Sequence, residues 1–407
     1  MRDDCSSNDT AMHATPLLGS SWLPMACWIL AFPGYFIYNS SVQLGLISSF
    51  LGGGSTVTIA ASLLLLARSY LRITLRGRKN SGSHVPGVLS IGPLFWAFLA
   101  VFALATLIGL ACGADTSITY QLFAYILKFA GLYVLAMLTP WEGRAFLYAA
   151  GVAQLVLFVF VVENSNAGAY LVNSLKPMAE DDPFDYQALA VSYLVVSLAA
   201  GYATKPVLLR WCQWLIALYG IFLIGARSEF VGMVFSIGLI EVARKKILSD
   251  YLFFASFPVI FLSAVLVIGD FSDIDSRMFG LFEPSADESV IARMALNASA
   301  WETILDNPIF GDFASYAPGA YAHNILSAWV DLGIIGFLLL LILLIGSTSS
   351  IVLVILRTRD SFSILALGCL GICVLLLIFA KAYFYQLIPV AMGIYTRAVS
   401  SERKGIE

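Results

Sequence analysis

Apolar runs long enough to cross a membrane recur along the whole chain, separated by short polar segments. A helix needs about 20 mostly apolar residues to cross the hydrocarbon core of a bilayer. Counting such runs gives roughly twelve, several of them short or interrupted, so the pattern predicts an all-α polytopic membrane protein with about 12 transmembrane helices. Residues 1–407 then form a single integral membrane domain. The runs with two clear ends cover residues 17–38, 43–67, 88–112, 118–138, 186–203, 207–226, 251–268 and 362–380.

A large polar loop, residues 270–322, separates two of the later runs and has a helical pattern of its own. Apolar residues recur at the spacing of one helix face, and Ser285 and Glu288 stand three apart, as in a capping box. We therefore expect an amphipathic helix lying on the membrane surface. Asp306, Asn307 and Pro308 end it. The residues of its apolar face are Ile291, Met294, Ala298, Trp301 and Leu305.

Basic clusters orient the predicted spans. Cytoplasmic loops of membrane proteins are enriched in Lys and Arg, and the strongest cluster here lies between residues 68 and 79. A second cluster, at residues 244–246, falls on the same side when the spans are counted. Both termini are then cytoplasmic, and the loop 270–322 is extracytoplasmic. The first cluster consists of Arg68, Arg72, Arg76, Arg78 and Lys79.

Composition narrows the classes of function. With 59% hydrophobic and 12% charged residues, the chain is far more apolar than a soluble protein, in which about 45–50% of residues are apolar. The net charge of −3 and the lack of a basic tract with interleaved aromatics argue against nucleic-acid binding. We interpret the six cysteines as buried thiols. The acidic run at residues 180–185 has no metal-binding pattern, so we expect neither a metal nor another cofactor.

The predicted extracytoplasmic side carries the candidate chemistry. His323 precedes a span, whereas His13 and His84 lie in a polar tail and a basic loop, so His323 is the plausible general base. Arg227, Arg277 and Arg293 fall on the same side, against the usual charge bias. Such arginines either snorkel to lipid phosphates or bind a ligand. Guanidinium groups match phosphate oxygens, which favours transfer onto a hydroxyl with a diphosphate as leaving group.

Lys128 lies inside a predicted span, where a lysine costs on the order of 2.5–3.5 kcal/mol to insert. It must therefore face the protein interior or a watery cavity. Two interpretations stay open: Lys128 pairs with a buried acid, or it lies near an anionic ligand.

The order of these features resembles the bacterial O-antigen ligase and lipid-linked polysaccharide polymerase superfamily, over about residues 225–337. The resemblance implies a metal-independent inverting glycosyltransferase of the bacterial inner membrane, with its active site facing the periplasm. Its donor would be a glycan linked to undecaprenyl diphosphate, and its acceptor a glycan or the lipid A core. Arg227 and Arg293 would bind the diphosphate and His323 would activate the acceptor. Separately from the resemblance, Asn324, Arg277, Lys128 and Tyr321 are candidates for supporting residues. The segments that carry the resemblance are Arg227 after a span, Arg293 eight residues before Trp301, Asp306-Asn307-Pro308-Ile309-Phe310-Gly311, His323-Asn324 and Asp331-Leu332-Gly333-Ile334-Ile335-Gly336.

The sequence departs from that family at Gly225-Ala226-Arg227-Ser228, where many relatives have Gly-Ser-Arg-Gly. Within the resemblance, a polymerase is favoured slightly over a ligase because the loop 270–322 is compact. A lipid-linked glycan flippase or transporter is the alternative from another class. Against it stand the lack of a hydropathy repeat, the near absence of acidic residues inside the spans, and the gathering of charge outside them.

Overall fold

The computed structural model describes residues 22–48, 60–61, 63–65, 92–166, 169–170, 186–244, 288–317, 320–358 and 361–406. These residues are helical apart from turns and a small antiparallel hairpin of β1 (Ser165–Asn166) and β2 (Ala169–Tyr170). Six of the described helices are long and apolar enough to cross a membrane, in agreement with a helical, multi-pass membrane protein. The predicted span at 251–268 and most of that at 43–67 lie outside the described residues. The six helical segments are Gly92–Cys112, Thr116–Leu138, Arg144–Glu163, Val207–Ile224, Leu326–Arg357 and Phe362–Phe379.

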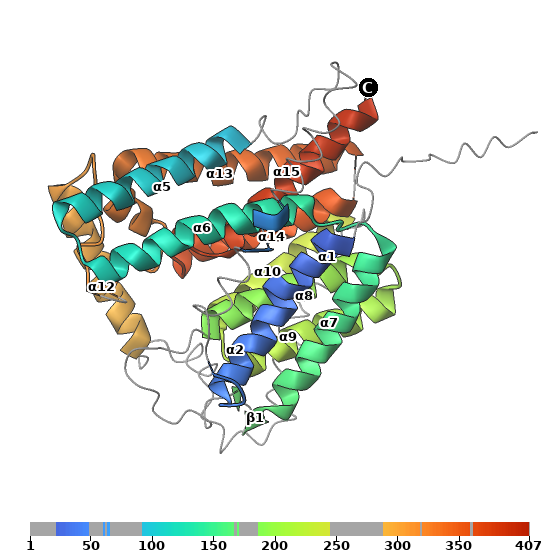
Figure 1. Ribbon diagram of the computed structural model, residues 1–407. Helices are drawn as coiled ribbons and strands as arrows, with labels where there is room; N and C mark the ends of the chain where they lie inside the picture. Colours follow the sequence, from blue (N-terminus) through green and yellow to red (C-terminus); the bar gives the residue numbers. More distant parts are fainter. Residues whose placement is uncertain are drawn as a thin grey trace, which may run out of the picture.

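The described helices form two groups that cross at an angle (Figure 1). Helix α14 belongs to the first group and packs against α10 of the second, which joins the two. The first group contains α5 (Gly92–Cys112), α6 (Thr116–Leu138), α13 (Leu326–Thr358), α14 (Ser361–Phe379) and α15 (Leu387–Ile406). The second contains α1 (Trp22–Ile29), η1 (Leu30–Gly34), α2 (Tyr35–Gln43), α7 (Arg144–Glu163), α8 (Tyr186–Ala203), α9 (Val207–Ile224) and α10 (Arg227–Arg244).

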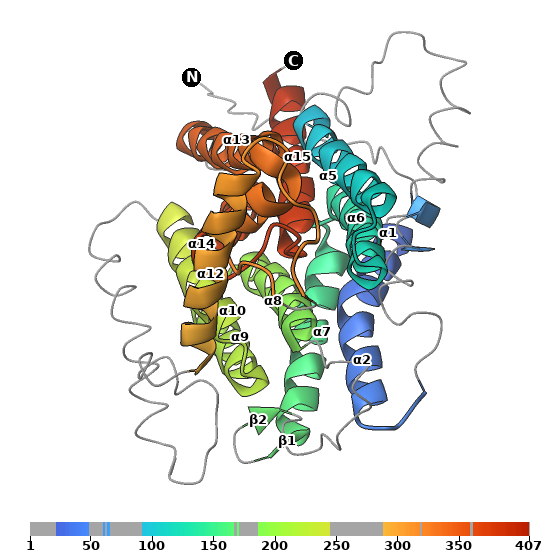
Figure 2. The ribbon, with the colours of Figure 1, turned by 90° about the vertical axis from the view of Figure 1, so that its left-hand side faces the viewer.

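The predicted amphipathic helix is present as α12 (Glu288–Asp306), which lies at one end of the first group (Figure 2). Its inner side is buried at Ala300 and Ile304, which pack against the start of α13. Its predicted apolar side is exposed, including Met294 at 68% and Leu305 at 76%. An exposed apolar side is what a helix on a membrane surface requires. Ser285, the first member of the predicted capping box, lies outside the described residues.

Two glycines join the end of α12 to α13. Gly311 and Gly333 both have positive φ, +71° and +64°, which other residues rarely adopt. A Cβ on Gly333 would lie 2.1 Å from the Ile309 carbonyl oxygen, so the two backbones approach too closely for any side chain. The Asp312 N–H donates to the Val330 carbonyl (2.6 Å). This contact brings the 306–311 segment against the kink in α13.

Buried carboxylates correct one expectation from the sequence. Glu229 and Glu241 of α10 and Asp331 of α13 are at most 1% exposed, although the apolar runs were expected to hold almost no acidic residues. Each has partners from other segments of the chain, which the apolar pattern does not reveal. Glu241, for example, accepts two hydrogen bonds from Arg210 of α9. Acidic residues in spans therefore give no argument against a transporter.

Candidate functional site

Asn324 fixes the turn that carries the candidate base. Its side-chain oxygen accepts from the Leu326 N–H (2.9 Å), which caps the start of α13. Its side-chain nitrogen donates to the Asn297 side chain on α12 (3.0 Å). The predicted supporting residue Asn324 thus ties α12 to α13. Because Asn324 provides the cap, the neighbouring imidazole of His323 is not needed for it.

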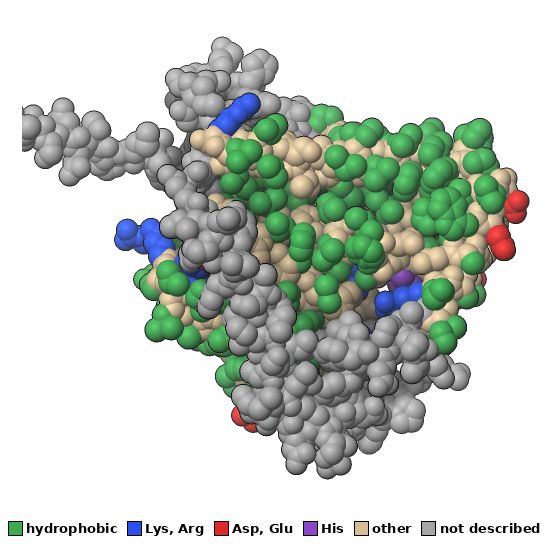
Figure 3. Space-filling view, turned by 180° about the vertical axis from the view of Figure 1, so that it is seen from behind, with side chains coloured by type: hydrophobic (Ala, Val, Ile, Leu, Met, Phe, Trp, Pro, Cys, Tyr) green, Lys and Arg blue, Asp and Glu red, His purple; other side chains and the backbone are tan. Residues whose placement is uncertain are grey.

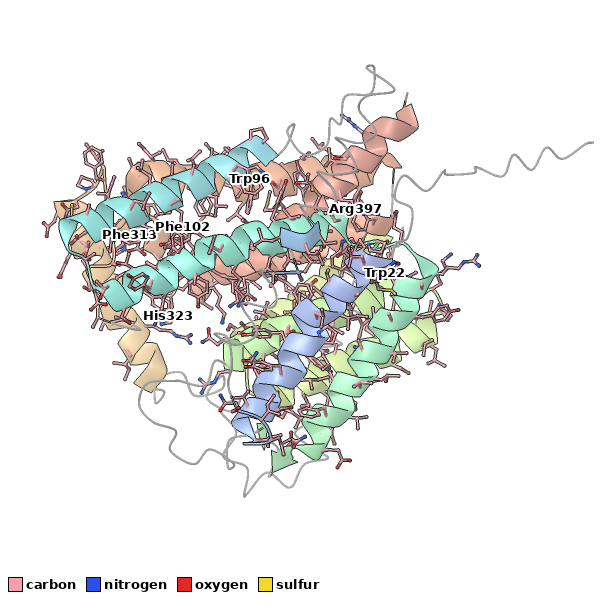
Figure 4. All side chains as sticks on the ribbon, viewed as in Figure 1. Trp22, Trp96, Phe102, Phe313, His323 and Arg397 are labelled. Carbon is pink, nitrogen blue, oxygen red and sulfur yellow. The ribbon has the colours of Figure 1, made fainter. Side chains whose placement is uncertain are left out.

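His323 lies at the end of the first helix group where α12 is found, and its ring is half-buried (Figure 4). Tyr321, another predicted supporting residue, packs against the imidazole with ring centroids 4.6 Å apart. Burial, followed by the positive charges of Arg293 and Lys381, lowers the pKa of His323 from 6.5 to about 4. The imidazole is therefore neutral near pH 7, the state in which it can accept a proton.

Arg293 supplies a positive charge close to this neutral imidazole. It is half-buried on α12, one turn before Asn297, and its charge acts on His323. Over the part of the chain that the structure describes, no carboxylate pairs with Arg293. In the space-filling view, the described histidine lies in a recess beside Lys or Arg side chains (Figure 3). The structure thus brings together two of the three residues predicted for the reaction.

Arg227 is the first residue of α10. Helix α9 ends at Gly225 in the left-handed conformation (φ +75°), which lets the chain turn directly into α10. Arg227 is half-buried there. The charges that lower the pKa of His323 are those of Arg293 and Lys381, and Arg227 is not among them. Arg227 is connected to this region through Glu229, two residues later, which pairs with Lys381.

Glu229 and Lys381 form a buried ion pair that sequence reasoning missed. The Lys381 Nζ lies 2.7 Å from Glu229 Oε1, and both side chains are at most 6% exposed. The same amine donates to Gln187 at the start of α8 (2.9 Å). One signal was available: Lys381 is a lone charge in the short segment between the last two apolar runs.

Asp331 holds the loop between α12 and His323. Its two oxygens accept from the Ala314 N–H (3.1 Å) and from the Tyr316 hydroxyl (2.9 Å). Burial, together with the charge of Asp331, raises the pKa of Tyr316, so the hydroxyl keeps its proton and donates. Phe313 in this loop packs on Gly109 near the end of α5. These contacts hold residues 313–316 against α5 and α13.

Lys128 lies in a different pocket. Its side chain is buried in α6, with the amine 5.1 Å from the centre of the Tyr35 ring. The pocket is also lined by Ser192 and Gln386. Tyr125, one turn earlier on α6, packs against Phe384. Arg277 and the acidic run at 180–185 lie outside the described residues.

Comparison of the chain with protein-family models, with curated proteins and with solved structures finds no match.

Proposed function

We propose that this protein is a glycosyltransferase that works at the outer face of the membrane. It moves a glycan from undecaprenyl diphosphate to a sugar hydroxyl, as an O-antigen or exopolysaccharide polymerase. One observation carries the proposal: Arg293, which has no carboxylate partner among the described residues, lies near His323, whose imidazole is neutral. A free cation beside a neutral base suits an anionic donor and a hydroxyl acceptor.

The reaction is a single displacement with inversion. The acceptor oxygen attacks the anomeric carbon, and its proton passes to the His323 imidazole. The bond between the anomeric carbon and the phosphate oxygen breaks, and its electron pair leaves with undecaprenyl diphosphate. Arg227 and Arg293 stabilise the charge that builds on the departing diphosphate, which metal ions do in many other transferases. The proposed enzyme is therefore independent of metal ions.

Polymerase and ligase differ only in the acceptor that enters the recess, a growing glycan or the lipid A core. The test is an assay of the purified protein with a lipid-linked glycan donor and each acceptor in turn. We expect a new glycosidic bond and released undecaprenyl diphosphate with the glycan acceptor. Product with the lipid A core alone would identify a ligase. An intact donor moved across a vesicle membrane, with no bond broken, would identify a transporter instead.

The proposed inner-membrane orientation places His323 towards the periplasm and both termini in the cytoplasm. Ala317, exposed in the loop before His323, and Lys205, exposed between α8 and α9, should lie on opposite sides. Single cysteines at these positions, in a variant without the native cysteines, provide the test. A membrane-impermeant thiol reagent applied to intact cells should label position 317 and spare position 205. The reverse pattern would invert the orientation and exclude an outer-face enzyme.

A further inference from the structure

Residues 380–386, between α14 and α15, bridge the two parts of the proposed site. On one side, the Tyr383 N–H donates to the Ser327 hydroxyl (3.0 Å), which itself donates to the Asn324 carbonyl (2.7 Å). Phe384 also packs against Tyr321, with ring centroids 4.9 Å apart, and Tyr321 packs against the base. The segment is thus attached to the turn that carries His323 by hydrogen bonds and by aromatic packing.

On its other side, the same segment is attached to α10. Lys381 pairs with Glu229 (2.7 Å), two residues after Arg227, and Glu229 also accepts from the Ser228 hydroxyl (2.8 Å). Gln187 accepts from the same lysine and adds α8 to the connection. One short segment therefore links the elements that carry His323 and Arg227.

We propose that Glu229 and Lys381 are a positioning pair, which fixes the His323 turn relative to Arg227 and presents a positive charge to the imidazole. This inference rests on the proposed function, and it assigns neither residue to contact with the substrate. Replacing a buried ion pair by apolar residues often leaves a protein equally stable or more stable. A contribution to stability is therefore a weak explanation for the presence of this ion pair. Its place between the elements that carry His323 and Arg227 is a stronger one.

The charges around His323 come from separate elements. Arg293 acts from α12 and Lys381 from the 380–386 segment, and both lower the pKa of the imidazole. Tyr321 packs on the ring from the same turn, and Asp331 of α13 is hydrogen-bonded to Tyr316 and Ala314. Removing the charge of Lys381 should therefore raise the pKa of His323, because it removes one of the two cations among the described residues that lower this pKa.

The experiment uses the full chain with His13→Gln and His84→Gln, so that diethyl pyrocarbonate reports on His323 alone among histidines. Lys381→Met should raise the pH midpoint of this modification. The double variant Glu229→Gln/Lys381→Met leaves no buried charge unpaired and should stay folded and monodisperse. Its turnover should fall about 10- to 100-fold, because small displacements of catalytic groups are costly. Lys205→Met, at an exposed lysine between α8 and α9, is the matched control.

The outcomes separate this inference from the function on which it rests. A double variant with normal turnover and an unchanged midpoint in Lys381→Met would overturn the positioning pair and leave the transferase intact. A wild-type protein without transferase activity would overturn the proposed function. In that case a raised midpoint in Lys381→Met would still support the charge that the pair presents to His323, since modification needs no turnover.

Discussion

Arg210 is buried and Arg293 is half-buried, and the two arginines have different surroundings. Arg210 of α9 is 5% exposed and donates from Nε and Nη2 to both oxygens of Glu241, at 2.6 and 2.8 Å. The third nitrogen of its guanidinium group, Nη1, donates to the carbonyls of Thr204 and Lys205. Arg293 of α12 has no such carboxylate among the residues that the structure describes, and it lies close enough to His323 to lower the pKa of the imidazole.

The difference indicates which arginine can bind a ligand. A guanidinium with both of its paired donors on a buried carboxylate has little capacity left for a phosphate. A half-buried guanidinium without a carboxylate keeps its charge and its donors. Arg210 therefore joins α9 to α10, whereas Arg293 is the arginine that we propose for the donor diphosphate.

The largest effect should come from His323→Ala. Loss of a general base typically costs 10²–10⁴-fold in rate, because no side chain then accepts the proton of the acceptor hydroxyl. Donor affinity should be nearly unchanged, since Arg227 and Arg293 remain. Single-turnover rates measured beside donor affinity provide the check, with monodispersity as the control for folding. Near-normal turnover would mean that the imidazole takes no part in the reaction.

Glu241→Ala should destabilise the protein strongly, because it leaves Arg210 buried without its carboxylate. Breaking a buried pair on one side costs about 3–5 kcal/mol. Arg293→Ala breaks no ion pair with a described residue, so its loss of stability should be much smaller, on the order of 0.5 kcal/mol. Unfolding of both variants in the same detergent compares the two directly. Equal losses would show that Arg293 is as structural as Arg210.

Arg293→Ala should instead reduce donor binding and turnover together, and Arg227→Ala should do the same. Removing one preorganised donor to a developing oxyanion costs about 10²–10³-fold in turnover. Arg293→Lys should restore only part of this, because an ammonium carries the charge without the paired donors. Donor affinity and single-turnover rate are measured for each variant. Full activity in the lysine variant would reduce the role of Arg293 to its charge.

The pH dependence should show the lowered pKa of His323. A base acts only when it is deprotonated, so the rate should fall as the pH decreases through the pKa of about 4. Between about pH 5 and 7 the acid limb should be flat, whereas an imidazole with the ordinary pKa of about 6.5 would already be losing activity there. Arg293→Gln removes a nearby positive charge, so it should move the acid limb to higher pH. A limb near pH 6.5 in the wild-type protein would contradict the site as described.

The smallest effect is expected from removal of divalent cations. Arginine charge takes the place of metal charge at the diphosphate, so a chelator should leave turnover unchanged. The measurement compares turnover with and without chelator in the same preparation. Loss of activity that magnesium or manganese restores would show that the acidic run at 180–185 binds a metal ion after all.

Local patterns in the sequence were enough to predict many of the helices. Apolar run length predicted the helices later described as α5, α6 and α14, because burial in lipid requires a long apolar stretch whatever it packs against. Helical spacing predicted α12, and Asp306-Asn307-Pro308 predicted its end. The choice of His323 as the candidate base needed no structure either, since the other two histidines lie in polar segments.

Contacts between residues far apart in the sequence could be seen only in the tertiary structure. Glu229 and Lys381 are far apart in the sequence, and Arg210 and Glu241 lie on different helices, yet each of these charges is paired in the folded chain. Gly311, in the loop after α12, lies against Gly333 at the kink inside α13, a contact that the linear pattern does not show. The sequence determined which segments are helical because helix formation depends on neighbours along the chain. Which charges are neutralised and which stay available depends on neighbours in space, so only the folded chain could separate Arg210 from Arg293.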